Sequence, residues 1–319
     1  MSAAIRVGVV GVGALGQHHA RVYAALPQAA LAGVHDLDPA RASDVADRFG
    51  ARSFATVEDL LPHVDAVSLA VPTADHHALT RRLLEAGKDV LVEKPIAATL
   101  AEADDLATVA VRTGRVLQVG HIERFNPAVR VLRETVAQPR FIEVHRLGSF
   151  SPRSLDIDVV LDLMIHDLDI LLALDGSEPV QVDAVGVPVL TPRVDIANAR
   201  LRFASGLIAN VTASRVSAER VRKFRAFAPS TYVSLDLAAR EARVHRLVRN
   251  DAGKAEIRVE RTSAPDEEPL RLQLESFLTA VRTRSKPEVS AEDGRRALAL
   301  AHVVLARMAD SQAKKVSAR

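Results

Sequence analysis

The stretch from Ile5 to Gly16 constrains the fold of this chain more than any other. An apolar run of strand length leads into a Gly-x-Gly-x-x-Gly loop, and a helix-forming segment follows at once. Such glycines let the backbone turn tightly, let a pyrophosphate approach it, and let the helix pack against the strand. Backbone N–H groups and the positive end of the helix dipole then face the phosphates. The residues expected to contact a dinucleotide here are Gly11, Val12, Gly13, Ala14, Leu15 and Gly16.

A second expected strand ends at Asp36, twenty residues after Gly16. An acid at this place hydrogen-bonds the adenosine ribose hydroxyls and repels a 2′-phosphate, so the sequence favours NAD over NADP as the cofactor. The alternative is a glycine turn followed by a solvated aspartate. The strand, the glycine spacing, the helix and the acid agree with one another, and together they argue for the nucleotide site.

The composition limits the remaining choices. A chain of 319 residues exceeds the usual size of a single core, so two domains are expected. The formal net charge is only +2, which argues against an extended nucleic-acid surface, and the absence of cysteine excludes thiol catalysis and thiolate metal sites. Met1 leads almost directly into the first strand, and apolar runs stay short of membrane-spanning length. We therefore expect a cytoplasmic protein without a membrane or nucleic-acid partner.

The pattern of apolar residues changes near residue 121. Up to that point strands and helices alternate, as in a parallel sheet covered on both faces. Asp38-Pro39 is expected to open a helix that runs to Phe49, and Thr99 to Glu102 to form a capping box for another. Beyond it we expect a helix over 159–174, several strands between 180 and 260 without intervening helices, and two final helices over 270–284 and 292–308. The expected fold class is α/β, with a doubly wound Rossmann domain at 1–121. An α+β domain with a large, mainly antiparallel sheet follows at 122–319.

Several polar residues fall where the strands of the first domain end. In an open α/β sheet, ligands bind beyond the carboxyl ends of the strands. Lys94 stands out, because the proline after it biases its backbone to an extended form at this crevice. A lysine past a strand end is usually a solvated loop residue, but its position and neighbours favour a functional role. The residues expected near the cofactor are Thr73, His76, Glu93, Lys94 and Gln118.

A second group lies on the helix expected over 159–174. Asp162, His166 and Asp169 would share one face, since residues four and seven positions apart are neighbours on a helix. Histidine has the side-chain pKa best suited to proton transfer near neutral pH, and a carboxylate can orient its ring. An ion pair on a helix surface explains the same spacing equally well. A metal site is a distant third reading, and we expect no metal.

A third group lies at the join between the two expected domains, where a cleft often binds ligands. The arginines Arg124 and Arg153 could form forks for phosphate, and Arg215 could add a third. Arginines are abundant in this chain, so structural ion pairs are the competing interpretation. The residues expected to bind substrate are His121, Arg124, Asn126, Arg153, Asp162 and His166.

Together these motifs resemble the Gfo/Idh/MocA family of oxidoreductases over essentially the whole chain. The glycine loop with Asp36 is similar to the family's nucleotide fingerprint, and Val71-Pro72-Thr73 with His76 to its loop after the fourth strand. Glu93-Lys94-Pro95 resembles its hallmark tripeptide, and Asp162-x-x-x-His166 its active-site pair. Members often carry glycines before that aspartate, whereas Asp158-Val-Val-Leu stands here, which leaves the substrate subtype open. The stretches 120–127 and 162–167 are similar to the nucleotide-sugar branch.

The resemblance implies an NAD-dependent dehydrogenase that oxidises a secondary sugar hydroxyl. The implied substrate is UDP-N-acetylglucosamine, oxidised at its 3-hydroxyl for lipid A synthesis; inositol or another free sugar is the alternative. The implied catalytic residues are Lys94, Asp162 and His166. His166 is the expected general base, with Asp162 orienting it and Lys94 stabilising charge on the oxygen, although the resemblance also allows Lys94 to take the proton. It further implies a homodimer or homotetramer. A non-catalytic NAD- or sugar-sensing regulator on the same scaffold is the second class of function.

Overall fold

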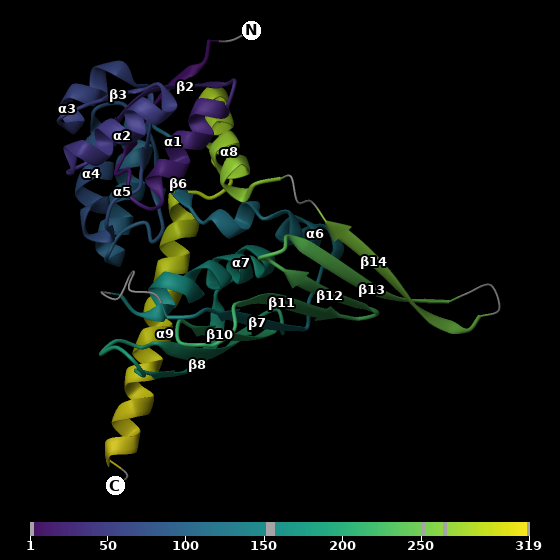
Figure 1. Cartoon of the computed structure of the whole chain (residues 1–319). Coiled ribbons are helices and arrows are strands. Elements are labelled where there is room, and N and C mark those ends of the chain that lie inside the picture. Colours follow the sequence, from purple (N-terminus) through teal and green to yellow (C-terminus); the bar gives the residue numbers. More distant parts are fainter. Residues whose placement is uncertain (1–2, 151–156, 250–252, 264–266, 318–319) are drawn as a thin grey trace. The chain divides into compact units, whose positions relative to one another are not determined.

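The computed structural model describes residues 3–150, 157–249, 253–263 and 267–317 (Figure 1). The chain divides into two compact units, one formed by 1–122 with 268–295 and the other by 123–267 with 296–319. The sequence assigned all of 122–319 to one domain, whereas the structure groups 268–295 with the first unit. Within the described residues, no helix has both the length and the apolar character needed to cross a membrane.

The first unit is built on a sheet of six parallel strands in the order β3-β2-β1-β4-β5-β6. Every residue of β4, β5 and β6 is buried, as expected for strands covered on both faces. The doubly wound fold expected from the sequence is thereby confirmed. The strands are β1 (Ile5–Val10), β2 (Ala29–His35), β3 (Arg52–Ser53), β4 (Ala66–Leu69), β5 (Asp89–Glu93) and β6 (Leu117–Gly120).

Local capping chemistry fixes where the helices of the first unit begin. The Asp38 carboxylate accepts hydrogen bonds from the first free N–H groups of α2, and Thr99 and Glu102 form a capping box at the start of α5. The helix α8 comes from late in the chain and buries Phe277 in the same core as Tyr23 of α1. The helices are α1 (Gly16–Ala25), α2 (Pro39–Phe49), α3 (Val57–Leu60), α4 (Thr73–Glu85), α5 (Leu100–Thr113) and α8 (Pro269–Thr283), with a 3₁₀ turn η1 (Leu61–His63).

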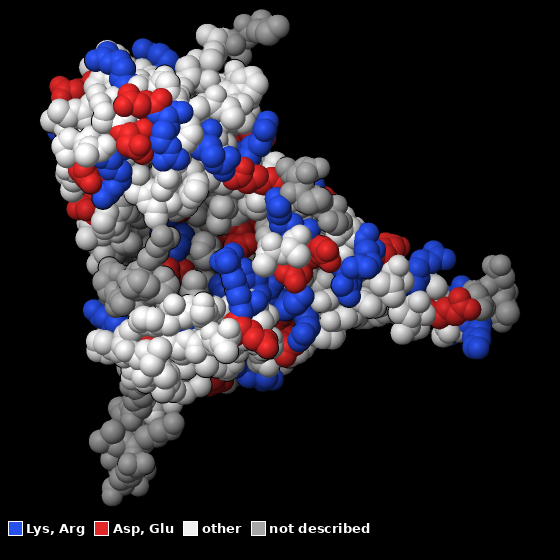
Figure 2. Space-filling view, viewed as in Figure 1, with Lys and Arg blue, Asp and Glu red and all other residues white. Residues whose placement is uncertain are grey.

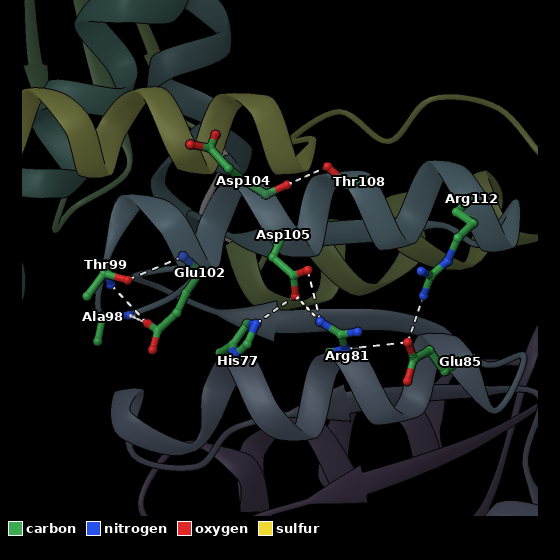
Figure 3. A network of polar contacts seen from close by, with 10 residues as sticks. All are labelled: His77, Arg81, Glu85, Ala98, Thr99, Glu102, Asp104, Asp105, Thr108 and Arg112. Atoms are coloured by element: carbon green, nitrogen blue, oxygen red, sulfur yellow. Dashed lines mark hydrogen bonds and ion pairs between the residues drawn. The ribbon is translucent and has the colours of Figure 1, made fainter.

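A network of charged side chains joins α4 to α5 (Figure 3). The Asp105 carboxylate lies 2.7 Å from the His77 ring and 2.9 Å from the Arg81 guanidinium. Glu85 continues the network, 3.4 Å from Arg81 and 2.7 Å from Arg112. Each of these half-exposed pairs contributes little by itself, but a connected set holds its helices more firmly. The network therefore helps to fix α4, whose first turn follows the end of β4.

The second unit is built on a sheet of eight strands in the order β14-β13-β12-β11-β7-β10-β9-β8. Its neighbours are antiparallel except for β7 and β10, which confirms the mainly antiparallel sheet. The strands are β7 (Phe141–Leu147), β8 (Pro179–Val187), β9 (Ile196–Phe203), β10 (Ile208–Ser214), β11 (Val221–Ala228), β12 (Thr231–Asp236), β13 (Glu241–Arg249) and β14 (Ala255–Ser263).

Helices cover one face of this sheet, and on the other face the described residues of β7, β9 and β11 are partly or fully exposed. Buried and exposed residues alternate along β9, and the buried ones join a core with α6, α7 and α9. The remaining elements are η2 (Ile122–Phe125), α6 (Pro127–Thr135), η3 (Val160–Met164), α7 (Ile165–Asp175) and α9 (Ala291–Ser317).

The helix expected over 159–174 begins with an irregular turn. The segment η3 is π-helical, and the N–H of Ile165 donates to the carbonyl of Val160, five residues earlier. Regular α-helix starts only at Ile165. Such turns are rare and occur often at functional sites. The extra residue lies between Asp162 and the turn that carries His166, so the simple spacing rule for an α-helix does not describe their relation.

Candidate functional site

The glycine loop after β1 leaves room for a ligand and no room for side chains. Gly11 has a φ of +79°, and a Cβ on Gly16 would come within 1.8 Å of the Gly11 carbonyl oxygen. A Cβ on Gly13, in contrast, would meet nothing within 4 Å. The first and third glycines are therefore needed for the turn and for the approach of α1 to the loop. The second lies at open space, where a pyrophosphate can approach the backbone.

A cavity of about 680 Å³ adjoins this loop, and Asp36 and Arg41 line one part of it. One Asp36 carboxylate oxygen accepts from the Val12 N–H at 2.8 Å, which ties the loop to the end of β2. The other accepts from the Asp38 N–H at 2.9 Å and from the Arg41 guanidinium at 3.1 Å. The cavity thus combines apolar walls with one fixed carboxylate, which suits the adenosine half of a dinucleotide. These residues fit the cofactor that the sequence implies.

The His76 ring joins the loops that follow β4 and β5. Its Nδ1 lies 2.7 Å from the Pro95 carbonyl oxygen, and its Nε2 lies 3.0 Å from the Val71 carbonyl oxygen. Burial lowers the pKa of this imidazole, although the two carbonyls oppose the effect. A neutral ring carries one N–H and donates to one carbonyl at a time. The buried His76 ring therefore contacts the backbone next to Lys94 and is not presented to solvent.

Glu93 is buried beneath the same loop. Its carboxylate lies 3.2 Å from Nε2 of His19 on α1, and Gln273 of α8 donates to it at 3.4 Å. A Cβ on Gly120 would come within 2.5 Å of this carboxylate, so the glycine makes space for it. Burial alone would raise the pKa of Glu93, but His19 and Lys94 hold that pKa below its ordinary value. A charged glutamate therefore lies directly before Lys94.

The other residues expected near the cofactor lie at the same edge of the sheet. Thr73 is the first residue of α4, and Lys94 follows β5 with its side chain partly exposed. Gln118 is fully buried in β6 and donates to the Gln273 carbonyl at 3.1 Å. His121 follows β6 and is also fully buried. The first unit thus gathers the sequence-predicted residues at the carboxyl ends of β4, β5 and β6.

In the second unit, Asp162 lies in η3 and His166 in the first turn of α7, both partly exposed. Asp169, which the sequence placed on their face, is instead buried and paired with Arg124 at 3.0 Å. Asp167 is buried as well, and both of its oxygens bind the Arg146 guanidinium. Two buried ion pairs therefore involve residues that closely follow His166 in the chain.

Two of the arginines expected to bind phosphate, and Asn126, make structural contacts within the second unit. Arg124 is buried in the pair with Asp169, and Arg215 is buried with its Nε 2.8 Å from Asp195. Asn126 caps α6 and donates to Glu123 at 3.0 Å. For Arg124 and Arg215, the structural ion pairs that competed with phosphate binding are present. Arg153 lies outside the described residues.

Sequence reasoning missed several charged groups that the structure brings together. Arg41 could have been found, because it follows Asp36 by five residues within the first turn of the expected helix. Arg146 and Arg222 both pair with Glu123, although the three residues are far apart in the sequence and no spacing rule links them. Residue type alone did not separate buried arginines from ligand-binding ones.

Two family models match this chain. Residues 5–121 match the oxidoreductase family model with an NAD-binding Rossmann fold, named GFO_IDH_MocA. Residues 128–229 match the model of the GFO/IDH/MocA C-terminal domain.

Among individual relatives, the UDP-N-acetylglucosamine 3-dehydrogenase of Acidithiobacillus ferrooxidans is 42% identical over 299 residues, which cover 93% of this chain and 95% of the relative. A solved structure of that enzyme has a TM-score of 0.89 and covers 96% of this chain and 98% of its own. The myo-inositol 2-dehydrogenase of Thermotoga maritima is 26% identical, with 98% of each chain covered.

Proposed function

The chain belongs to the Gfo/Idh/MocA family of oxidoreductases, and from this premise we propose that it oxidises the 3-hydroxyl of UDP-N-acetylglucosamine with NAD⁺. The observation that carries the proposal is the 42% identity, over 93% of the chain, to an enzyme with that printed activity. The chain also keeps Lys94, Asp162 and His166, which a protein that merely sensed the cofactor would not need.

The choice of NAD rests on Asp36. Its fixed carboxylate suits the two ribose hydroxyls of NAD and would repel the 2′-phosphate of NADP. Gly11 to Gly16 would hold the pyrophosphate through backbone N–H groups. When bound, NAD⁺ supplies the acceptor for the hydride that leaves the sugar carbon.

The residues of the chain would handle the proton and the developing charge. We assign His166 as the base that takes the hydroxyl proton, because a histidine is neutral and basic near pH 7. Asp162 would orient that ring and bind the sugar, and Lys94 would stabilise negative charge on the oxygen as the C–H bond breaks. The buried Glu93 and the His76 contact to Pro95 would act through Lys94, by fixing the backbone on both sides of it.

Absorbance of the reduced nicotinamide tests the activity directly. UDP-N-acetylglucosamine, free N-acetylglucosamine and myo-inositol are compared with NAD⁺, and the nucleotide sugar is expected to react fastest. A preference for myo-inositol would instead indicate an inositol dehydrogenase, the activity of the Thermotoga maritima relative. No turnover with any sugar, together with tight NAD binding, would favour the sensor.

Two substitutions test the assignment of the catalytic residues. Lys94→Ala and His166→Ala are each expected to lower kcat by about a hundredfold or more and to leave NAD binding nearly unchanged. The exposed Lys286 offers a matched control, since Lys286→Ala removes a lysine of the same unit as Lys94. Near-normal turnover in both variants would contradict the assignment.

We also propose that the enzyme is a homodimer that buries the face of the second sheet opposite its helices. Phe141, Phe227, Tyr232, His245 and Val259 lie directly opposite one another on five successive strands, so they form one row on one face. Ring centroids along this row are 5.8, 4.8 and 5.1 Å apart. An apolar row across a sheet face is unfavourable in water and typical of an interface.

Light scattering of the purified protein tests this dimer. Phe227→Arg is expected to give monomers, because a charge in the middle of the row would be buried without a partner. Val111→Arg is the control, since Val111 is 84% exposed on α5. A monomeric wild-type protein, or a Phe227→Arg variant with unchanged mass, would refute the interface.

A further inference from the structure

Two arginines face each other across neighbouring strands of the second unit. Arg146 of β7 and Arg222 of β11 are directly paired in the antiparallel ladder, so both point to the face that α7 covers. Like charges directly opposite on one face destabilise a sheet. Such an arrangement persists only where other groups at the site supply negative charge.

Arg146 binds the two nearest carboxylates of the protein, those of Asp167 and Glu123. Its guanidinium donates to both oxygens of Asp167, at 2.8 and 2.7 Å, and to Glu123 at 2.8 Å. Arg222 shares the same Glu123 oxygen at the longer distance of 3.5 Å. The side chain of Arg222 is 34% exposed, whereas that of Arg146 is 4% exposed. Arg222 is thus the more exposed of the two arginines, and among the described residues its one ion pair is with the carboxylate that it shares with Arg146.

The surroundings of Arg222 disfavour its positive charge. Burial and the neighbouring Arg146 lower the pKa of Arg222, and Arg220 lowers it further, while Glu123 and Asp167 oppose them. Arg220 precedes β11 and is exposed. Figure 2 shows lysine and arginine side chains near β11 and β12, with aspartate and glutamate side chains among them. The start of β11 therefore carries two arginines, of which Arg222 shares one carboxylate and Arg220 makes no ion pair among the described residues.

This charge lies beside the start of α7. Arg146 contacts both Glu123, the partner of Arg222, and Asp167, the residue after His166. The chain of contacts runs from Arg222 through Glu123 and Arg146 to α7, all within the second unit. An anionic group held at Arg222 would therefore lie near the residue that we assign as the base.

We propose that Arg220 and Arg222 bind the diphosphate of the nucleotide-sugar substrate. The inference rests on the proposed function and gives Arg220 and Arg222 the phosphate-binding role that the sequence suggested for Arg124 and Arg215. Arg124 and Arg215 are already buried in ion pairs with aspartates. Guanidinium forks bind phosphate oxygens through charge-assisted hydrogen bonds, and a diphosphate offers such oxygens to the two arginines at the start of β11.

Binding of UDP alone, followed by calorimetry, tests the site without turnover. Arg220→Ala and Arg222→Gln are each expected to raise the Kd for UDP about ten- to hundredfold. Arg258→Ala removes an exposed arginine of the same sheet and serves as the matched control, with unchanged UDP binding. In turnover assays, the loss is expected in KM for the UDP sugar, while the Kd for NAD stays constant.

The melting temperature of the variants and their sugar oxidation separate a failure of the site from a failure of the proposed function. If Arg222→Gln melts well below the wild type, Arg220→Glu replaces it, because Arg220 is exposed and its reversal reaches the ligand without disturbing the core. If the wild-type protein oxidises UDP-N-acetylglucosamine and the folded variants bind UDP as tightly as it does, the proposed site is wrong and the proposed function stands. Arginine-dependent UDP binding without sugar oxidation would overturn the function and leave the site.

Discussion

Replacing Asp36 by serine tests how the cavity beside the glycine loop chooses its cofactor. The wild-type carboxylate is 8% exposed and is held by the Val12 and Asp38 N–H groups and by Arg41. Serine removes the charge, is too short to keep these bonds, and leaves the Arg41 guanidinium without its Asp36 partner. We expect the variant to lose affinity for NAD and to gain affinity for NADP.

The magnitude follows from two terms. Losing a charge-assisted hydrogen bond to the ribose costs about 1.5–3 kcal/mol, which raises the Kd for NAD about ten- to hundredfold. Two unit charges about 4 Å apart at an effective dielectric constant of about 20 repel by about 4 kcal/mol. Arg41 already offsets part of that repulsion in the wild type. We therefore expect the preference for NAD over NADP to fall by about a hundredfold or more.

The assay is kcat/KM for NAD⁺ and NADP⁺ at saturating sugar, supported by the Kd of each cofactor. Asp38→Ser is the matched control, because it removes a nearby charge and keeps a side chain that caps α2. Asp36→Ser/Arg41→Ala is expected to lose most of the gain for NADP, since Arg41 is the cation left to bind the 2′-phosphate. An unchanged cofactor ratio in Asp36→Ser, or an equal gain in the double variant, would refute the reasoning.

Three further results are expected. Gly16→Ala should raise the Kd for NAD by about a hundredfold in titrations, because its Cβ would come within 1.8 Å of the Gly11 oxygen and displace the loop. Arg146→Met should lower the free energy of unfolding by about 3–5 kcal/mol in urea, since it leaves two buried carboxylates without their cation. Burial alone would raise the pKa of Asp195, but the N–H groups of 189 and 191 and Arg215 hold it below its ordinary value. The stabilisation that the ionised Asp195 gives the fold is therefore complete above about pH 4 and is lost as the pH falls. Asp195→Asn should make the free energy of unfolding in urea depend less on pH below about pH 4. An equal pH dependence in the wild type and the variant would contradict this.

The parts of the fold that the sequence predicted are those set by neighbouring residues. The turn at Gly11, the Asp38 cap with Pro39 after it, and the capping box from Thr99 to Glu102 all follow from contacts within a few positions. These local signals, with the alternation of strands and helices, were enough for the order of elements in the Rossmann unit. The mainly antiparallel second sheet followed from repeated strands without intervening helices.

The parts that sequence reasoning missed depend on distant partners. Whether an arginine binds a ligand or a buried aspartate is decided by what folds against it, and Arg124 meets Asp169 from 45 residues away. The π-helical turn of Val160–Met164 changes the spacing between Asp162 and His166, and Asp169 is buried in its pair with Arg124. The catalytic roles of Lys94, Asp162 and His166 remain predictions that rest on the family resemblance and on the tests above.

The return of α8 to the first unit has a consequence for how the protein is made. Leu274, Phe277 and Leu278 belong to the core that also contains Tyr23. A ribosome releases the amino-terminal residues long before this helix, so the nucleotide-binding unit stays incomplete while the whole strand-rich region is being translated. Its apolar surface next to α1 is exposed during that interval, when holding chaperones can bind it. A chain that ends after residue 122 would lack α8 and the apolar side chains that this helix adds to the core of the nucleotide-binding unit.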